Sequence, residues 1–418
     1  MGLPQELVDY IMDILRDDIR ALKACSLTCK ALFASARRPI HQTLSVTSRL
    51  DKQFLTVEEK KRPDHLLNHR EIGLRYLSAM AERGLFRYTR QVHIRKFYWF
   101  TPDLLLPQIH HFQSLDRVHT LIIERCYVVA WTTYFNTYFV HFYSTLTSLT
   151  LRQPSGPYRL LLQFALQFPN LENLCIEWVQ GLMRPDLNAP FVFDKSPPLR
   201  GRLRLAGADA VDRWPMDLIR GLRIRMNFRY VELEGFLGTQ AQHILDACAH
   251  TLEDLTIAPS AICMCQVSFL CLTVAERSIN FLLTDRSDLP RVRLTGIMAL
   301  RRFTLRTAIS QMPFVPDPLL EALPTIMSPV FCEFTLEMGI LPSNFNRPAS
   351  EHWGYWGGID QFLEERFARH GGFKFIIRTG RLYDREIFQR HARETFPLLA
   401  GRGCIYFEMS RSIDSYWS

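Results

Sequence analysis

Apolar residues recur along most of the chain in one short pattern, apolar-x-x-apolar-x-apolar, whose last two positions alternate as in a half-buried β-strand. Successive copies begin 28, 25, 57, 24 and 48 residues apart. We interpret these steps as one, one, two, one and two units of about 24 to 29 residues. Weaker copies at Val92/Ile94 and Leu203/Leu205 extend the series. The six full copies are Val118/Leu121/Ile123, Leu146/Leu149/Leu151, Leu171/Leu174/Ile176, Phe228/Val231/Leu233, Leu252/Leu255/Ile257 and Leu300/Phe303/Leu305.

Helical stretches lie between the predicted strands. One runs from Leu160 to Phe168 and stops at Pro169-Asn170, and another covers residues 240–249. A unit of one strand and one helix cannot bury its own apolar edge, so it has to stack on its neighbours. The period resembles that of leucine-rich repeats. We therefore predict an α/β fold, an irregular leucine-rich-repeat-like solenoid of parallel strands plus helices. It should be irregular because the Asn or Cys that usually follows the last apolar residue is present only as Cys126.

The same patterns divide the chain into four segments. Residues 1–45 form a short helical motif, 46–90 a helical connector, 91–350 the solenoid and 351–418 a C-terminal capping region. The connector should contain a helix over 69–83, closed by Gly84. In the capping region we predict helices over 359–370 and 384–394 and strands over 373–378 and 404–408.

The first predicted helix of the N-terminal motif is apolar along one face. Leu7, Ile11, Ile14 and Leu15 have the spacing of neighbours on a helix surface, and Pro4 can precede such a helix but not lie inside it. One or two further short helices follow, up to about residue 39. Helices this short enclose little apolar surface by themselves. We expect the apolar face to pack on a partner or on the rest of the chain.

The N-terminal segment also resembles the F-box. The likeness is carried by Leu3-Pro4-x-Glu6-Leu7-x-x-x-Ile11-x-x-x-Leu15, then Asp18, Leu22, Cys25-Ser26 and Lys30-Ala31-Leu32. Leu32 stands where the family usually has a tryptophan. The resemblance implies a motif that docks the Skp linker subunit of a cullin-based (SCF-type) ubiquitin ligase. The residues that it implies in this docking, or in packing the motif itself, are Leu3, Pro4, Leu7, Ile11, Leu15, Leu22 and Leu32.

An F-box followed by leucine-rich repeats is a familiar adaptor layout. The tail, with Ile359-Asp360, Phe396-Pro397-Leu398-Leu399 and Arg402-Gly403-Cys404-Ile405, is similar to F-box proteins of mushroom-type fungi. These likenesses imply a substrate-recognition adaptor whose solenoid binds a protein target of unknown identity. Two alternatives stay open: the N-terminal helices cap the solenoid, or the chain is a repeat-protein scaffold unconnected to ubiquitin that binds nucleic acid through its arginines.

Composition narrows the class of protein without identifying it. The 418 residues are 47% hydrophobic and 22% charged, close to globular averages, which excludes a fibrous or disordered chain. The net charge of +8 is small for this length, so a nucleic-acid partner is not favoured. The N-terminus lacks the pattern of a signal peptide, and there is no run of 18 apolar residues. We expect no membrane span and a location in the cytoplasm or nucleus.

No motif points to catalysis or to a cofactor. The sequence lacks a G-x-S-x-G, a phosphate-binding loop, a dinucleotide glycine pattern and an H-E-x-x-H. The cluster Cys263-Met264-Cys265 with Cys271 lacks the paired spacing of a structural zinc site. We predict a protein that is not an enzyme and that has no metal and no cofactor, with these cysteines buried and unligated.

Two further groups of residues have an ordinary structural interpretation. Cys25 and Cys29 are four residues apart, so we expect them on the same side of one helix, in its core. Residues 87–100 mix basic and aromatic side chains as nucleic-acid platforms do. The alternation of Val92 and Ile94 favours a repeat strand instead.

Overall fold

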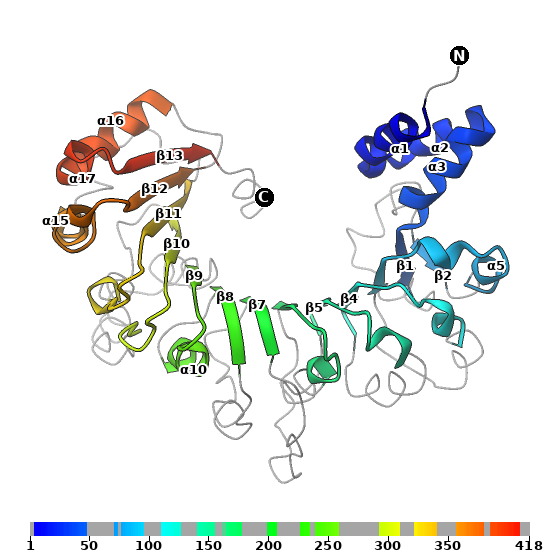
Figure 1. Ribbon diagram of the computed structural model, residues 1–418, viewed down its shortest axis with the longest axis horizontal. Helices are drawn as coiled ribbons and strands as arrows, with labels where there is room; N and C mark the ends of the chain where they lie inside the picture. The colour runs from blue at the N-terminus through cyan, green and yellow to red at the C-terminus, as the bar shows by residue number, and fades with distance from the viewer. Residues whose placement is uncertain are drawn as a thin grey trace, which may run out of the picture. The chain divides into compact units, whose positions relative to one another are not determined.

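A computed structural model describes residues 4–47, 71–73, 77–95, 110–126, 140–154, 161, 164–177, 199–206, 226–234, 239–258, 292–309, 322–340, 357–379 and 385–409. The chain divides into two compact units, residues 1–197 and 198–418. Each unit contains parallel strands interleaved with helices, so the protein is of the α/β class, consistent with an α/β solenoid (Figure 1).

The first unit begins with three helices that lead directly into a parallel sheet. Its strands are paired in the order β2-β1-β3-β4-β5-β6, and each pair is parallel. Helix α3 contacts both β1 and the 3-10 helix η4. The elements are α1 (Gln5–Ile14), η1 (Leu15–Asp17), α2 (Ile19–Thr28), α3 (Lys30–His41), β1 (Thr43–Thr47), β2 (Glu71–Gly73), α5 (Leu77–Glu82), η4 (Leu85–Tyr88), β3 (Gln91–Arg95), η5 (His110–Ser114), β4 (Thr120–Glu124), η6 (Val140–Phe142), β5 (Ser148–Arg152) and β6 (Asn173–Glu177).

The second unit has a parallel sheet whose strands follow one another in sequence order, from β7 to β13. Helices α10, α15 and α17 lie along one face of this sheet (Figure 1). The elements are β7 (Leu199–Ala206), β8 (Met226–Glu234), α10 (Thr239–Cys248), β9 (Asp254–Ala258), β10 (Arg302–Ile309), η8 (Leu323–Thr325), β11 (Glu333–Ile340), α15 (Gly357–Arg366), η11 (Ala368–His370), β12 (Lys374–Thr379), α16 (Arg385–Thr395), α17 (Pro397–Gly401) and β13 (Ile405–Met409).

The recurring apolar pattern is the core of both units. All eighteen residues of the six full copies are buried, with at most 3% of the side chain exposed. In register, the last two positions of each copy form continuous apolar rows across the strands, because neighbouring parallel strands place equivalent residues side by side. One row in the second unit contains the stacked rings of Phe303, Phe334 and Phe375. The sequence prediction of the repeat strands is confirmed.

Two predictions about spacing and local structure are wrong. The step of 48 residues between the last two copies was interpreted as two units, but β9 pairs directly with β10, so it is one long unit. The predicted helix over 69–83 is divided, because Glu71–Gly73 forms strand β2 beside β1, and helix α5 covers Leu77–Glu82. Gly84 does end that region in the left-handed conformation, with φ of 63°.

The C-terminal elements agree with the sequence prediction to within a few residues. The two predicted helices correspond to α15 with η11 and to α16, and the two predicted strands are β12 and β13. Both strands continue the parallel sheet beyond β11. Asp360 of α15 is buried and accepts hydrogen bonds from the backbone N–H groups of Leu398 and Leu399, which fixes the start of α17.

Candidate functional site

The three N-terminal helices have a small core of their own. Met12, Leu22 and Ala36, one from each helix, are buried together, and partly buried apolar side chains surround them. The carboxylate of Asp18 accepts hydrogen bonds of 3.0 Å from the backbone N–H groups of Arg20 and Ala21, which caps the start of α2. The side chains packed around this core are Leu15, Ile19, Cys25, Leu32 and Ile40.

Helix α1 is apolar on its outer side as well. Its inner side buries Val8 and Met12. Four further large side chains on α1 are between 39% and 64% exposed, and their spacing of three and four residues places them on one face. We call this set the α1 apolar face: Leu7, Tyr10, Ile11 and Ile14. Single exposed apolar residues are common on proteins, but four on one helix face indicate a surface that can bind a partner.

The structure separates the seven residues that the F-box resemblance implies into two groups. Leu22 is fully buried, and Leu15 and Leu32 pack against the same core. In contrast, Pro4, Leu7 and Ile11 are exposed. The seventh, Leu3, lies outside the described residues. The first group stabilises the motif, and the second group offers the larger exposed surface to a partner.

Several exposed apolar side chains of the three helices are not among the docking residues that the F-box resemblance implies. Ile14 belongs to the apolar helix face that its spacing predicted, and Tyr10 lies on the same face, four residues before Ile14, a spacing that could have identified it. Leu27 on α2, 87% exposed, and Phe33 on α3, beneath the guanidinium of Arg37, had no such signal.

The cysteine predictions have mixed outcomes. Cys25 packs against the core of the three helices, as expected, but Cys29 is exposed and lies between α2 and α3 in extended conformation. The prediction that both share one helix face is therefore wrong. The cluster of cysteines 263, 265 and 271 lies outside the described residues. Burial raises the pKa of the Cys248 thiol to about 12, so that thiol stays protonated and unreactive.

A second feature is a row of alternating charges on the polar face of the first unit's sheet. Arg95, Glu124, Arg152 and Glu177 occupy the same register position on β3 to β6. The Nε atoms of Arg95 and Arg152 lie 3.2 Å and 3.0 Å from carboxylate oxygens of Glu124 and Glu177. On the other face of the sheet, Val92 and Ile94 of β3 are buried. Strand β3 is an ordinary repeat strand, as predicted.

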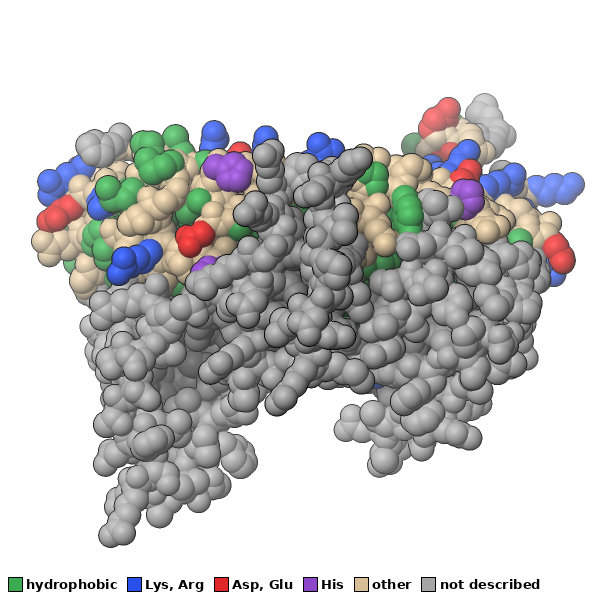
Figure 2. Space-filling model, turned by 90° about the horizontal axis from the view of Figure 1, so that it is seen from below, with side chains coloured by type: hydrophobic (Ala, Val, Ile, Leu, Met, Phe, Trp, Pro, Cys, Tyr) green, Lys and Arg blue, Asp and Glu red, His purple; other side chains and the backbone are tan. Residues whose placement is uncertain are grey.

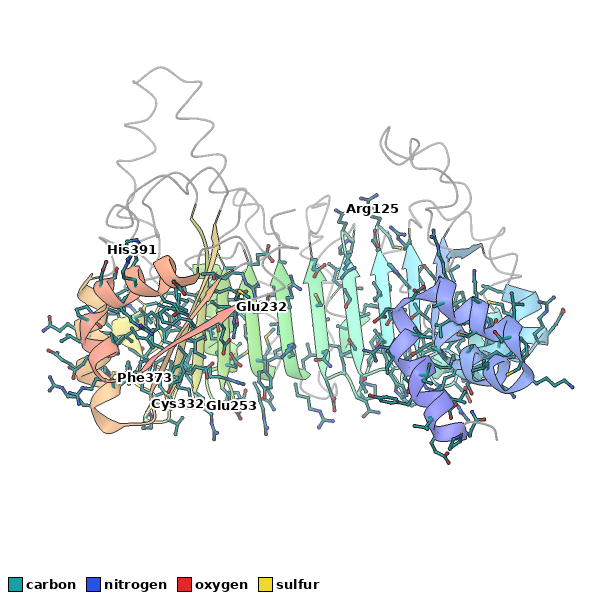
Figure 3. All side chains as sticks on the ribbon, turned by 90° about the horizontal axis from the view of Figure 1, so that it is seen from above. Arg125, Glu232, Glu253, Cys332, Phe373 and His391 are labelled. Carbon is teal, nitrogen blue, oxygen red and sulfur yellow. The ribbon has the colours of Figure 1, made fainter. Side chains whose placement is uncertain are left out.

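The second unit repeats this arrangement on a larger scale. Arg306, Glu337, Arg378 and Glu408 are side by side in register on β10 to β13. Glu337 is 2% exposed and lies between the two arginines, at 3.3 Å from Arg306 and 3.9 Å from Arg378. Arg306 also reaches across β9 to Glu232, at 2.8 Å. Glu232 is labelled in Figure 3. Both arginines of this row therefore have carboxylates beside them.

The charge row of the first unit makes the free energy of unfolding depend on pH in the acid range. A hydrogen bond from His93, helped by Arg95, holds the pKa of Glu124 at about 2, although burial opposes this shift. A lowered pKa in the folded state stabilises the fold above the usual value of 4.5, and this contribution is lost as the pH falls from about 4.5 to about 2. We expect the free energy of unfolding to fall by up to about 3 kcal/mol over that pH range. Urea unfolding at several pH values measures it, and Glu124→Gln should flatten the profile.

The described residues give no support for metal chemistry or a membrane span. Among them, no group of three or more His, Cys, Asp or Glu side chains could hold a metal ion. No helix in the described part of the chain is long and apolar enough to cross a bilayer.

The geometry defines an α/β protein of parallel strands interleaved with helices, with a three-helix group at its N-terminus. No protein-family model matches the chain, and no curated protein matches it either.

Proposed function

We propose that the chain is a substrate-recognition adaptor of a cullin-based (SCF-type) ubiquitin ligase. In this proposal the N-terminal helices are an F-box-like motif that docks the Skp linker subunit. The parallel strands and helices that follow are a leucine-rich-repeat-like solenoid that binds a protein target. The adaptor itself does no chemistry and contributes proximity between the target and the ligase.

The single observation that carries this proposal is the α1 apolar face. A capping helix would turn its apolar residues toward the chain that it covers, leaving polar residues outside. Helix α1 does bury Val8 and Met12, yet Leu7, Tyr10, Ile11 and Ile14 remain largely exposed. Pro4, Leu7 and Ile11 are among the residues that the resemblance assigns to docking, which favours the adaptor over a simple cap.

The nucleic-acid alternative receives less support from the strands. The arginines of the charge rows are neutralised by glutamates at 2.7–3.9 Å. On the face seen in Figure 2, the basic side chains of the described part are interspersed with acidic and apolar ones. Phosphate backbones are bound by a continuous basic stripe, and the described side chains on this face do not form one.

Binding to the purified Skp linker subunit tests the proposal. The full chain should bind it with measurable heat in calorimetry, and the double variant Leu7→Ser/Ile11→Ser should bind at least tenfold more weakly. Both side chains are more than a third exposed, so the melting temperature should change little. No binding by the full chain would refute the adaptor.

A matched control uses another exposed leucine. Leu398 of the second unit is 45% exposed, so Leu398→Ser removes a similar apolar area without touching the N-terminal helices. This variant should bind the linker as the parent chain does. If Leu7→Ser/Ile11→Ser instead unfolds the protein, the interpretation of these helices as a cap is favoured.

A further inference from the structure

A pocket lined by arginines opens in the first unit, on the side of the sheet where the strands begin. Its volume is about 270 Å³. Its lining is Arg38, Gln42, Arg87, Tyr88, Arg90 and Arg117. None of these six described residues is acidic, and four of them are arginines that line one small concave space.

Backbone hydrogen bonds hold the pocket in place. The carbonyl of Gln42, just before β1, accepts from the N–H groups of Arg90 and Gln91, at 2.9 Å and 3.0 Å. The carbonyl of Arg90, just before β3, accepts from His119 and Thr120 at 2.8 Å and 3.1 Å. The pocket is therefore built where α3 ends and where strands β1, β3 and β4 begin, and its walls are rigid elements rather than one loop.

The arginines of the pocket have weak carboxylate partners. Arg117 is 4.0 Å from its neighbour Asp116, at the limit of an ion pair between two exposed side chains. Arg38 is close enough to lower the pKa of Asp9, but hydrogen bonds from Ser35 and Gln5 contribute more to that shift. This differs from the arginines of the charge rows, which lie between glutamates.

The other two arginines are oriented by groups that carry no charge. Arg87 donates a 2.6 Å hydrogen bond to the hydroxyl of Tyr88, and its guanidinium lies 4.7 Å from the centre of that ring. Among the described residues, the guanidinium of Arg90 makes only long contacts, of 3.4 Å and 3.5 Å, to the carbonyls of Arg87 and Thr89. Like charges held together repel one another unless an anion joins them.

We propose that this pocket binds a small anion with two or more phosphate groups. Guanidinium groups match phosphate oxygens in geometry and charge, and they can donate two hydrogen bonds at once. A single phosphate carries about two negative charges at neutral pH, fewer than the four cations present. The volume admits a compact oligophosphate but not a folded macromolecule. The site is independent of the proposed ligase role.

Calorimetry on the full chain with sodium pyrophosphate as the probe tests this site. We expect one pyrophosphate per chain, weaker binding of orthophosphate and tighter binding of tripolyphosphate. The variant Arg38→Gln/Arg87→Gln should bind pyrophosphate at least tenfold more weakly. Both arginines are exposed, so the variant should fold, and circular dichroism melting checks this.

Two further variants separate a built site from general attraction. Arg20→Gln/Arg301→Gln removes the same charge from exposed arginines outside the pocket and should bind as the parent does. Arg38→Lys/Arg87→Lys keeps the charge but loses the planar fork, and it should bind with intermediate affinity. The site is refuted if the full chain binds no pyrophosphate, if the outside variant is weakened equally, or if only an oligonucleotide binds.

Discussion

Replacing Phe334 with alanine is expected to lower the free energy of unfolding by about 3–5 kcal/mol, the cost of deleting a buried aromatic ring. Phe334 is fully buried in the second unit, and its ring lies between those of Phe303 and Phe375, with centres 5.8 Å and 5.5 Å away. The loss removes apolar contact on both sides and leaves a cavity between two strands. Urea unfolding monitored by circular dichroism measures it.

Two companion variants show whether the effect comes from the core row. Phe334→Leu keeps most of the apolar volume and should cost about 1.5 kcal/mol or less. Tyr406→Ala also removes a ring from this sheet, but Tyr406 is 45% exposed, so its cost should be small. If Phe334→Ala and Tyr406→Ala cost the same, the phenylalanine row does not stabilise the sheet.

The strands could be predicted because a parallel sheet covered by helices requires apolar residues at fixed positions of every unit. Each predicted triplet is buried, from Val118 to Leu305. Counting units from the period failed at the step of 48 residues, since an insertion and an extra repeat lengthen a chain equally. Strand β2 was missed because three residues, Glu71 to Gly73, are too few to show an alternation.

The orientation of α1 could not be predicted from its sequence. Apolar residues at 7, 8, 11, 12, 14 and 15 spread over an arc of about 160°, nearly half of the helix surface, so the spacing does not decide which part of that arc faces inward. The structure shows that Val8 and Met12 do. The F-box resemblance implies both Leu7 and Leu22 in docking or packing. Only their burial shows that Leu22 packs inside the motif while Leu7 stays exposed.

The charge rows, in contrast, were present in the sequence and were overlooked. Each of their residues comes directly after an apolar residue of its strand, for example Arg95 after Ile94, Glu124 after Ile123 and Arg306 after Leu305. Equivalent positions of neighbouring units meet in a parallel sheet, so alternation of sign at one position predicts cross-strand ion pairs. The arginine pocket had no such signal, because its residues come from three separated segments.

Glu337→Ala should cost about 3 kcal/mol of unfolding free energy, near the low end of the range for breaking a buried ion pair. Glu337 is buried between Arg306 and Arg378. Removing it leaves two guanidinium groups facing each other across one strand. The cost stays near the low end because each arginine keeps another carboxylate, Glu232 or Glu408.

Glu408 provides the matched control, because it pairs with the same Arg378 at 2.7 Å but is 46% exposed. Glu408→Ala should cost below about 1 kcal/mol, as for surface pairs. A double-mutant cycle of Glu337→Gln with Arg306→Gln then isolates the coupling of the buried pair. Coupling well above that of Glu408→Gln with Arg378→Gln is expected, since burial weakens screening by water. Equal coupling in the two cycles would mean that the row is solvated along its whole length, and its arginines would then be open to an acidic partner.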